Sequence, residues 1–166
     1  MGVAAVLRPG VPMGFIDGVP FVAALGAAEA MGARVAWPHD VVGEDGKPLA
    51  HVATRAGYDD EGIYVTCELE GDAAGEAAMD AAVARVDAWA AKVAAGSKAG
   101  PLAAVLEEYF DACLLMGKPV AVVRNDGTVA CKGTLAGMDI WGRVTVKLVD
   151  GRDAEIAPGQ ASVRAL

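Results

Sequence analysis

The stretch Arg34-Val-Ala-Trp-Pro-His-Asp-Val-Val42 decides the fold that we predict for this chain. A short β-type run over residues 34–37 stops at Pro38, whose ring fixes φ and leaves no N–H for a sheet. His39 and Asp40 are then expected at the exposed mouth of a strand-to-turn junction, and residues 43–47 close a hairpin-like loop. Strand ends that feed such loops often carry ligand chemistry. His39 and Asp40 are therefore the first candidate site residues.

A helix is expected just before this stretch. Asp17 is a candidate N-cap, and Pro20 lies in the first turn, where its missing donor costs nothing. Apolar residues then recur at helical spacing over 21–31, and Gly32 supplies the stop. Together these features predict a helix that leads directly into the run at 34–37.

Three further runs indicate strands that join residues 34–37 in one sheet. Residues 3–7 read as a short strand, and residues 49–56 and 62–69 alternate apolar and polar side chains around an acidic turn. We predict a mixed sheet of at least four strands. Helices are predicted over 76–95 and from Pro101 onward.

From Lys118 the apolar period changes to two, which predicts a second unit. Short β-type runs follow at close spacing, separated by turn signals such as Asn125-Asp-Gly127 and Asp150-Gly151. This pattern is typical of a small barrel. We place the domain boundary near Gly117, giving a first domain over 1–117 and a barrel over 118–166. The predicted fold class is α+β.

Composition limits the partners and the compartment. The chain has 166 residues and a net charge of −8, without a basic stripe, which argues against nucleic acid and anionic membrane. Cys67, Cys113 and Cys131 form no CxxC and sit in apolar runs, as free thiols do in a reducing compartment. The longest apolar run, residues 19–28, is too short to span a bilayer. A cytoplasmic protein is expected.

Four segments carry a resemblance to a known family. They are Ala36-Trp-Pro-His-Asp40, Pro48-Leu-Ala-His-Val52, the barrel text from Gly133 through Asp139 to Val144, and Gly159-Gln-Ala-Ser-Val-Arg164. In this order they resemble the biotin protein ligase family, the class that also includes lipoate ligases. The resemblance implies the back half of the catalytic domain followed by an SH3-like C-terminal barrel.

The resemblance also implies an activity and a ligand set. These ligases join a carboxylic acid to ATP as an acyl-adenylate and pass the acyl group to a lysine of a carrier domain. Biotin and ATP, as biotinyl-adenylate, are the implied ligands, and a biotin or lipoyl carrier domain is the implied partner. Carried over by position, the ligand-binding residues are Trp37, His39, Asp40, His51 and Arg164.

The departures from the family pattern concern charge and backbone access. The family's Gly/Arg-rich loop is absent, and Ala36 stands where the signature has lysine. Losing one charge-assisted hydrogen bond at a transition state costs roughly 10–200-fold in rate. His51, Glu68 and Glu70 replace residues of the glycine-bearing segments, and the two glutamates add negative charge. No residue is assigned a catalytic role.

Each candidate has a structural alternative. His39, Asp40 and His51 match no standard metal-ligand spacing, and a polar turn in which the first two bond to backbone is the favoured alternative. Either histidine could instead replace the missing lysine as a cation below about pH 6.5. Trp37 fits a core or pocket wall as well as a stacking platform, and Arg164 fits a nucleotide contact or an acidic-surface pair.

Three functional hypotheses follow. The first is a non-catalytic binding or regulatory module that retains the ligase fold. The second is half of a split ligase, completed by a separately encoded front half, and the third is weak or altered adenylate chemistry. Loss of front strands would expose a sheet edge, which predicts a homodimer. Trp141, in a barrel loop, is either an exposed contact or structural.

Overall fold

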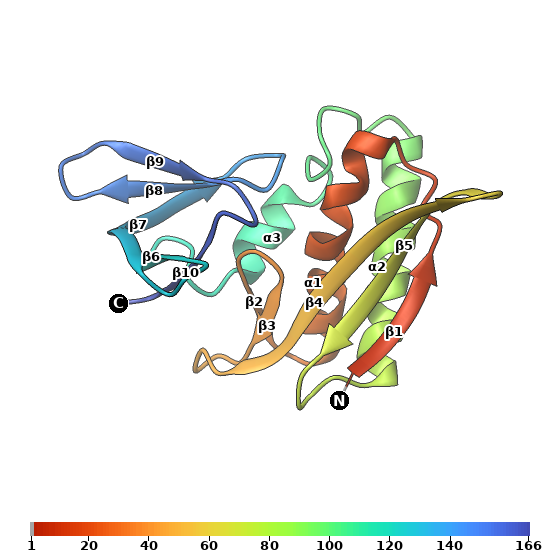
Figure 1. Cartoon of the computed structure of the whole chain (residues 1–166), viewed down its shortest axis with the longest axis horizontal. Helices are drawn as coiled ribbons and strands as arrows, with labels where there is room; N and C mark the ends of the chain where they lie inside the picture. The colour runs from red at the N-terminus through yellow and green to blue at the C-terminus, as the bar shows by residue number, and fades with distance from the viewer. Residues whose placement is uncertain (1) are drawn as a thin grey trace.

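The computed structural model describes residues 2–166, which form two five-stranded sheets and three α-helices (Figure 1). The first sheet has the strand order β1-β5-β4-β3-β2. Its strands are β1 (Gly2–Leu7), β2 (Arg34–Ala36), β3 (Asp40–Val42), β4 (Pro48–Asp59) and β5 (Gly62–Glu70). These strands account for every β-type run that the sequence predicted in this half.

The first sheet is antiparallel between all its named strands, so the predicted mixed sheet is wrong. The reason is connectivity: β2 to β5 follow one another through short turns, which can join only antiparallel neighbours. β1 pairs antiparallel with β5, from Gly2 opposite Glu70 to Leu7 opposite Val65. Its other side is the edge of the sheet.

Helices α1 (Val19–Ala30) and α2 (Glu76–Ala94) cover one face of this sheet (Figure 1). They pack closely because Gly26 of α1 has no side chain, and a Cβ there would lie 2.6 Å from the carbonyl oxygen of Ala81. α1 is buried along most of its length. The segment 13–30 is long and apolar enough to cross a membrane, but 72% of it is buried, as expected for a core helix.

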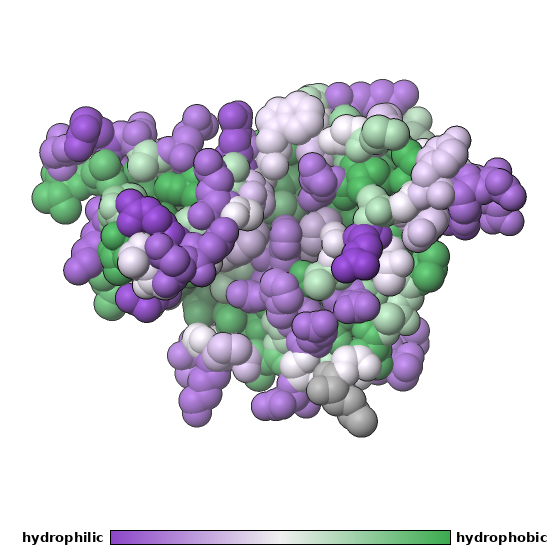
Figure 2. Space-filling model, viewed as in Figure 1, coloured by the Kyte–Doolittle hydropathy of each residue, from purple (hydrophilic) through white to green (hydrophobic). Residues whose placement is uncertain are grey.

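Alternation along the strands separates the two faces of the sheet. Val52 and Leu69, directly opposite each other, are 1% exposed and pack towards the helices. Their sequence neighbours His51 and Glu70 point to the other face, which no helix covers. Figure 2 shows hydrophilic residues spread over this second face, which we call the open face.

The second sheet forms the SH3-like barrel, in the order β10-β6-β7-β8-β9. Its strands are β6 (Pro119–Arg124), β7 (Val129–Met138), β8 (Val144–Leu148), β9 (Asp153–Ile156) and β10 (Ala161–Ala165). Four of them match predicted runs. β10 was not predicted as a strand, and it pairs with β6, far away in sequence.

Two helix starts differ from prediction because the backbone there is used elsewhere. The N-cap of α1 is Gly18 rather than Asp17, after a 3₁₀ helix over Met13–Gly18. The helix expected from Pro101 begins only at Leu106, as α3 (Leu106–Ala112). The carbonyl of Pro101 accepts the indole N–H of Trp89, which holds residues 101–105 in turns.

The barrel is connected to the preceding part of the fold by hydrogen bonds as well as by the covalent chain. Leu102 donates its N–H to the carbonyl of Ile140 at 2.9 Å, in the loop between β7 and β8. Cys113, at the end of α3 and before the barrel, ties that segment to the first sheet through an isolated parallel bridge with Val35 of β2. The domain boundary at Gly117 stays a prediction, although β6 begins two residues later.

Candidate ligand site on the open face and the neighbouring cleft

Asp40 and His51 form a side-chain pair on the open face. They are directly opposite each other on β3 and β4, and Nδ1 of His51 lies 2.5 Å from Oδ1 of Asp40. This corrects the alternative in which Asp40 bonds to backbone. The hydrogen bond to Asp40 raises the pKa of His51 against the opposing effect of burial, with smaller contributions from the charges of Asp40 and Glu70. Both side chains are about half exposed.

The register brings Ala36, Glu68 and Glu70 together around this pair. Ala36 pairs with Asp40, Glu70 pairs with His51, and Glu68 lies two residues before Glu70 on the same face. A sequence comparison alone could name these residues but could not place them on one surface. The strand register shows that Ala36, Glu68 and Glu70 share the open face with the Asp40–His51 pair.

The fixed charge of the open face is predominantly negative around this point. Asp40, Glu68 and Glu70 supply carboxylates, and Arg55, opposite Thr66, supplies a guanidinium on the same face. A second guanidinium, that of Arg34 on β2, is bound to the carbonyls of Asp111 and Ala112. Small hollows of about 400 and 210 Å³ lie over these strands, and Glu68 lines both. An anion in the larger hollow would meet the carboxylates of Glu68 and Glu70, and one in the smaller hollow would meet Glu68 together with Arg55.

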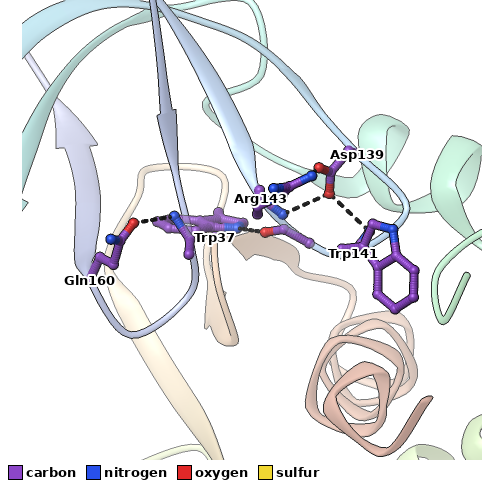
Figure 3. A network of polar contacts seen from close by, with 7 residues as sticks. Trp37, Asp139, Trp141, Arg143 and Gln160 are labelled. Carbon is purple, nitrogen blue, oxygen red and sulfur yellow. Dashed lines mark hydrogen bonds and ion pairs between the residues drawn. The ribbon is translucent and has the colours of Figure 1, made fainter. Parts of the chain in front are cut away.

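Trp37 lies in the core and connects the sheet to the barrel. It is 1% exposed, and its indole N–H donates to the carbonyl of Gly142 at 2.8 Å, as Figure 3 shows. The turn that follows begins with a cis Trp37–Pro38 peptide bond, and the hydroxyl of Tyr109 donates to the carbonyl of Pro38 at 2.9 Å. Of the two roles considered for Trp37, the structural one matches these contacts.

His39 is turned away from the Asp40–His51 pair and towards α1. Its ring stands edge-on to Phe21, with 4.6 Å between centroids. Burial lowers the pKa of His39 to about 4, helped by His51 and opposed by Asp40, so the imidazole is neutral at neutral pH. Its Nε2 is buried without a hydrogen-bond partner among residues 2–166. The predicted hydrogen bond from the side chain of His39 to the backbone is not seen among the described residues.

An open cleft of about 730 Å³ lies where the first sheet meets the barrel. Its lining comes from the start of α1, the turn after β2, β4, and two barrel loops. The lining residues are Asp17, Pro20, Phe21, His39, Thr54, Trp141, Arg143, Ala157, Pro158 and Gly159. Trp141 and Arg143 were not predicted as site residues. The sequence feature that could have indicated Trp141 as a site residue is an aromatic side chain next to a tight turn.

Arg164 lies neither beside the Asp40–His51 pair nor in the cleft. It lies on β10 opposite Ala121 of β6, is exposed, and does not line the cleft. It makes no ion pair within the part of the chain that the structure describes. The structure thus groups Asp40 with His51, places His39 in the cleft, and separates Trp37 and Arg164 from both. Over residues 2–166 no group of three or more metal-binding side chains occurs.

No family model matches the sequence, and no curated protein matches it either. Solved structures do match the fold. The ligand-free biotin protein ligase of Aquifex aeolicus aligns with a TM-score of 0.69 at 16% identity, covering 99% of this chain and 82% of that one. The same ligase in complex with biotin and ATP gives 0.66 at 16% identity, covering 99% and 78%.

A biotin protein ligase-like protein of unknown function from Silicibacter sp. TM1040 is also similar. It aligns with a TM-score of 0.63 at 17% identity, covering 93% of this chain and 77% of that one. The chain thus has the α+β fold of biotin protein ligases, as the resemblance predicted. About a fifth of the Aquifex chains has no counterpart here, so the coverage does not require that a whole front half be absent.

Proposed function

We propose that this chain is a biotin protein ligase-like protein that does not form an acyl-adenylate on its own and acts as a binding or regulatory module. The observation that carries the proposal is the composition of the open face. Ala36 occupies the position of the signature lysine, beside the Asp40–His51 pair and the carboxylates of Glu68 and Glu70.

The chemistry of adenylation explains why this composition matters. Joining a carboxylate to ATP brings two anions together, so the site needs fixed positive charge and closely approaching backbone donors. On this face the carboxylates of Glu68 and Glu70 oppose Arg55, while Asp40 is paired with His51. The residues present therefore do not fit biotinyl-adenylate, and no step through biotin or ATP is derived.

His51 does not compensate for the missing lysine at neutral pH. Its positive charge, when present, is held by Asp40 at 2.5 Å, so the pair adds no net positive charge to the face. A buried histidine such as His39, whose pKa is lowered to about 4, stays uncharged there. Neither histidine gives the face a free cation.

The test is biotin-dependent exchange of labelled pyrophosphate into ATP. We expect the purified chain to show no exchange above a blank, with biotin or with lipoate. The triple variant Ala36→Lys, Glu68→Gly and Glu70→Asn places the residue types of the ligase signature at these three positions. Its exchange rate is compared with that of the unmodified chain. Exchange by the unmodified chain at a rate comparable with an active ligase would overturn the proposal.

A second candidate is half of a split ligase, and one observation favours it. The outer side of β1 is a free sheet edge beside the uncovered open face, where another polypeptide could add strands. A separately encoded front half would then supply the Gly/Arg-rich loop, and transfer to a carrier domain would follow. This assembly predicts an inert chain that gains exchange activity only when the second polypeptide is added.

The same edge also accommodates a second copy of the chain, as in the predicted homodimer. Size-exclusion chromatography with light scattering distinguishes the two assemblies. A homodimer has twice the mass of the chain when the chain is measured alone. Half of a split ligase has the mass of a single chain until the second polypeptide is added. The cytoplasmic location remains a proposal that rests on the three unpaired cysteines.

A further inference from the structure

We infer that the cleft between the first sheet and the barrel is a binding site for a flat, largely apolar organic molecule that is neutral or singly cationic and carries a hydrogen-bond donor. The site lies beside the open face that the proposed function concerns, and Thr54 of β4 lines both the cleft and the smaller hollow that contains Arg55 and Glu68. Four features of the cleft support this inference: its size, a preformed aromatic platform, an unpaired acceptor, and its charge.

The size and lining of the cleft suit a small molecule. Its volume of about 730 Å³ falls within the range of about 300–1,000 Å³ that is usual for ligand pockets. Apolar groups from three separate elements, among them Phe21, Pro20 and Pro158, form most of the wall. The polar side chains of the lining, those of Asp17, His39, Thr54 and Arg143, are available to fix the orientation of the ligand.

Trp141 forms an aromatic platform that the loop holds in place. The side chain is 48% exposed, yet its backbone N–H donates to Oδ1 of Asp139 at 2.9 Å. Arg143 binds the same carboxylate through its backbone N–H at 3.0 Å and through its Nε at 2.7 Å. Figure 3 shows the indole of Trp141 projecting away from this network. The loop is ordered by polar contacts that leave the ring free to stack.

The loop is also anchored from behind, so the platform is fixed before any ligand arrives. The carbonyl of Gly142 accepts the indole N–H of Trp37. Gly142 has φ +87°, and a Cβ there would lie 2.6 Å from the ring of Phe21, which shows how closely the loop docks on α1. A preformed site loses less conformational entropy on binding.

His39 supplies the unpaired acceptor. Its Nε2 is the buried side-chain polar atom that lacks a partner among the described residues. Buried polar groups are nearly always paired with protein or water, so this atom requires a partner. Because the imidazole is neutral at neutral pH, Nε2 accepts an N–H or O–H from the ligand in the tautomer that carries its proton on Nδ1.

The charge around the cleft disfavours an anionic ligand. Asp17 lines the cleft and has no ion-pair partner among residues 2–166, while Arg143 is held by Asp139 and lies in the field of Glu155. Acidic groups therefore outnumber the single guanidinium. A cation over the exposed face of Trp141 would also gain cation–π attraction.

The experiment uses three probes that share one ring and differ in charge: 2-naphthylmethylamine, 2-naphthalenemethanol and 2-naphthoate. Each is titrated into the ¹⁵N-labelled full chain while the tryptophan indole N–H signals are followed. Trp37 and Trp89 are buried and donate to carbonyls, so they serve as internal references. Probes of this size bind with millimolar dissociation constants, so titration extends to about 10 mM.

We expect the amine and the alcohol to shift the Trp141 signal in a saturable way, with the carboxylate at least about tenfold weaker. Trp141→Ala should abolish binding, while Tyr58→Ala, which removes a ring that is 77% exposed and outside the cleft, should leave it unchanged. His39→Phe keeps an aromatic ring against Phe21 and should weaken binding about threefold to tenfold.

Three results would overturn the inference. They are no Trp141 shift with the amine or the alcohol, undiminished binding in Trp141→Ala, and tightest binding by the carboxylate. None of these results bears on pyrophosphate exchange, so failure here leaves the proposed function untouched. Conversely, exchange activity at the open face would not change the expected ranking of the three probes.

Discussion

Replacing Trp37 with phenylalanine tests the connection between the first sheet and the barrel. The substitution removes the indole N–H that reaches the carbonyl of Gly142 at 2.8 Å and leaves that acceptor unpaired. An unpaired buried polar group costs about 1–3 kcal/mol. The smaller ring leaves a cavity that adds about 1 kcal/mol. The free energy of unfolding should therefore fall by about 2–4 kcal/mol.

Trp89→Phe is the matched control. Trp89 is also 1% exposed and donates its indole N–H to a carbonyl, that of Pro101, at 2.7 Å. Its partner lies between α2 and α3 and not in the barrel, and the loss of stability should be similar. Trp37 binds the loop that carries Trp141 directly, whereas Trp89 reaches it only through the segment in which Leu102 donates to Ile140, so Trp37→Phe should shift the Trp141 indole N–H signal more than Trp89→Phe does.

The assay is urea unfolding followed by circular dichroism, together with the amide spectrum of each variant. For a chain of this length the expected loss lowers Tm by roughly 5–15 °C. A cost below about 0.5 kcal/mol for Trp37→Phe would show that the hydrogen bond contributes little. An equal shift of the Trp141 signal in both variants would refute the idea that Trp37 specifically holds the loop.

Three further predictions follow from backbone geometry and from the two histidines. Gly142→Ala should lower the free energy of unfolding in urea by about 2–4 kcal/mol, because it combines a positive φ with a clash against the ring of Phe21 in α1. Gly151→Ala has the same φ of +87° but open space around it, and it should lower this free energy by only about 1 kcal/mol. Gly26→Ala should lower the free energy of unfolding by about 1–3 kcal/mol, since its methyl would meet a backbone oxygen of α2, and an unchanged Tm would contradict the close helix crossing. In an NMR pH titration the pKa of His39 should lie near 4 and that of His51 above 6.5. The contribution of His39 to stability is therefore lost as pH falls from about 6.5 towards 4, whereas the contribution of His51 is full below about 6.5 and is lost as pH rises through its folded pKa. Titration of both histidines near pH 6.5 would contradict both environments.

Local sequence signals predicted most elements because those elements depend on their own residues. The hairpin around Gly43–Lys47, the helix ending before Gly32 and the turns of the barrel all follow from backbone chemistry that can be read in a few residues. The antiparallel arrangement of the first sheet and the pairing of β10 with β6 depend on contacts between distant segments. Local patterns do not carry that information.

The candidate site shows the same division. Asp40 and His51 were found as polar residues near a turn, but their contact depends on strand register. His39 and Asp40 are adjacent in sequence, yet they serve different surfaces because the turn directs one side chain towards Phe21 and the other onto the sheet. The cleft could not be predicted, since five separate segments form it.

The most direct test of the central claim is thermal unfolding of the chain with a stable biotinyl-adenylate analogue, repeated with the lipoyl version. A ligand at 100 times its dissociation constant adds about 2.7 kcal/mol, which corresponds to a rise in Tm of about 5–10 °C for a chain of this size. Because carboxylates predominate on the open face, we predict no shift with either analogue. A rise of about 5–10 °C would contradict the account and show that the face still holds the adenylate.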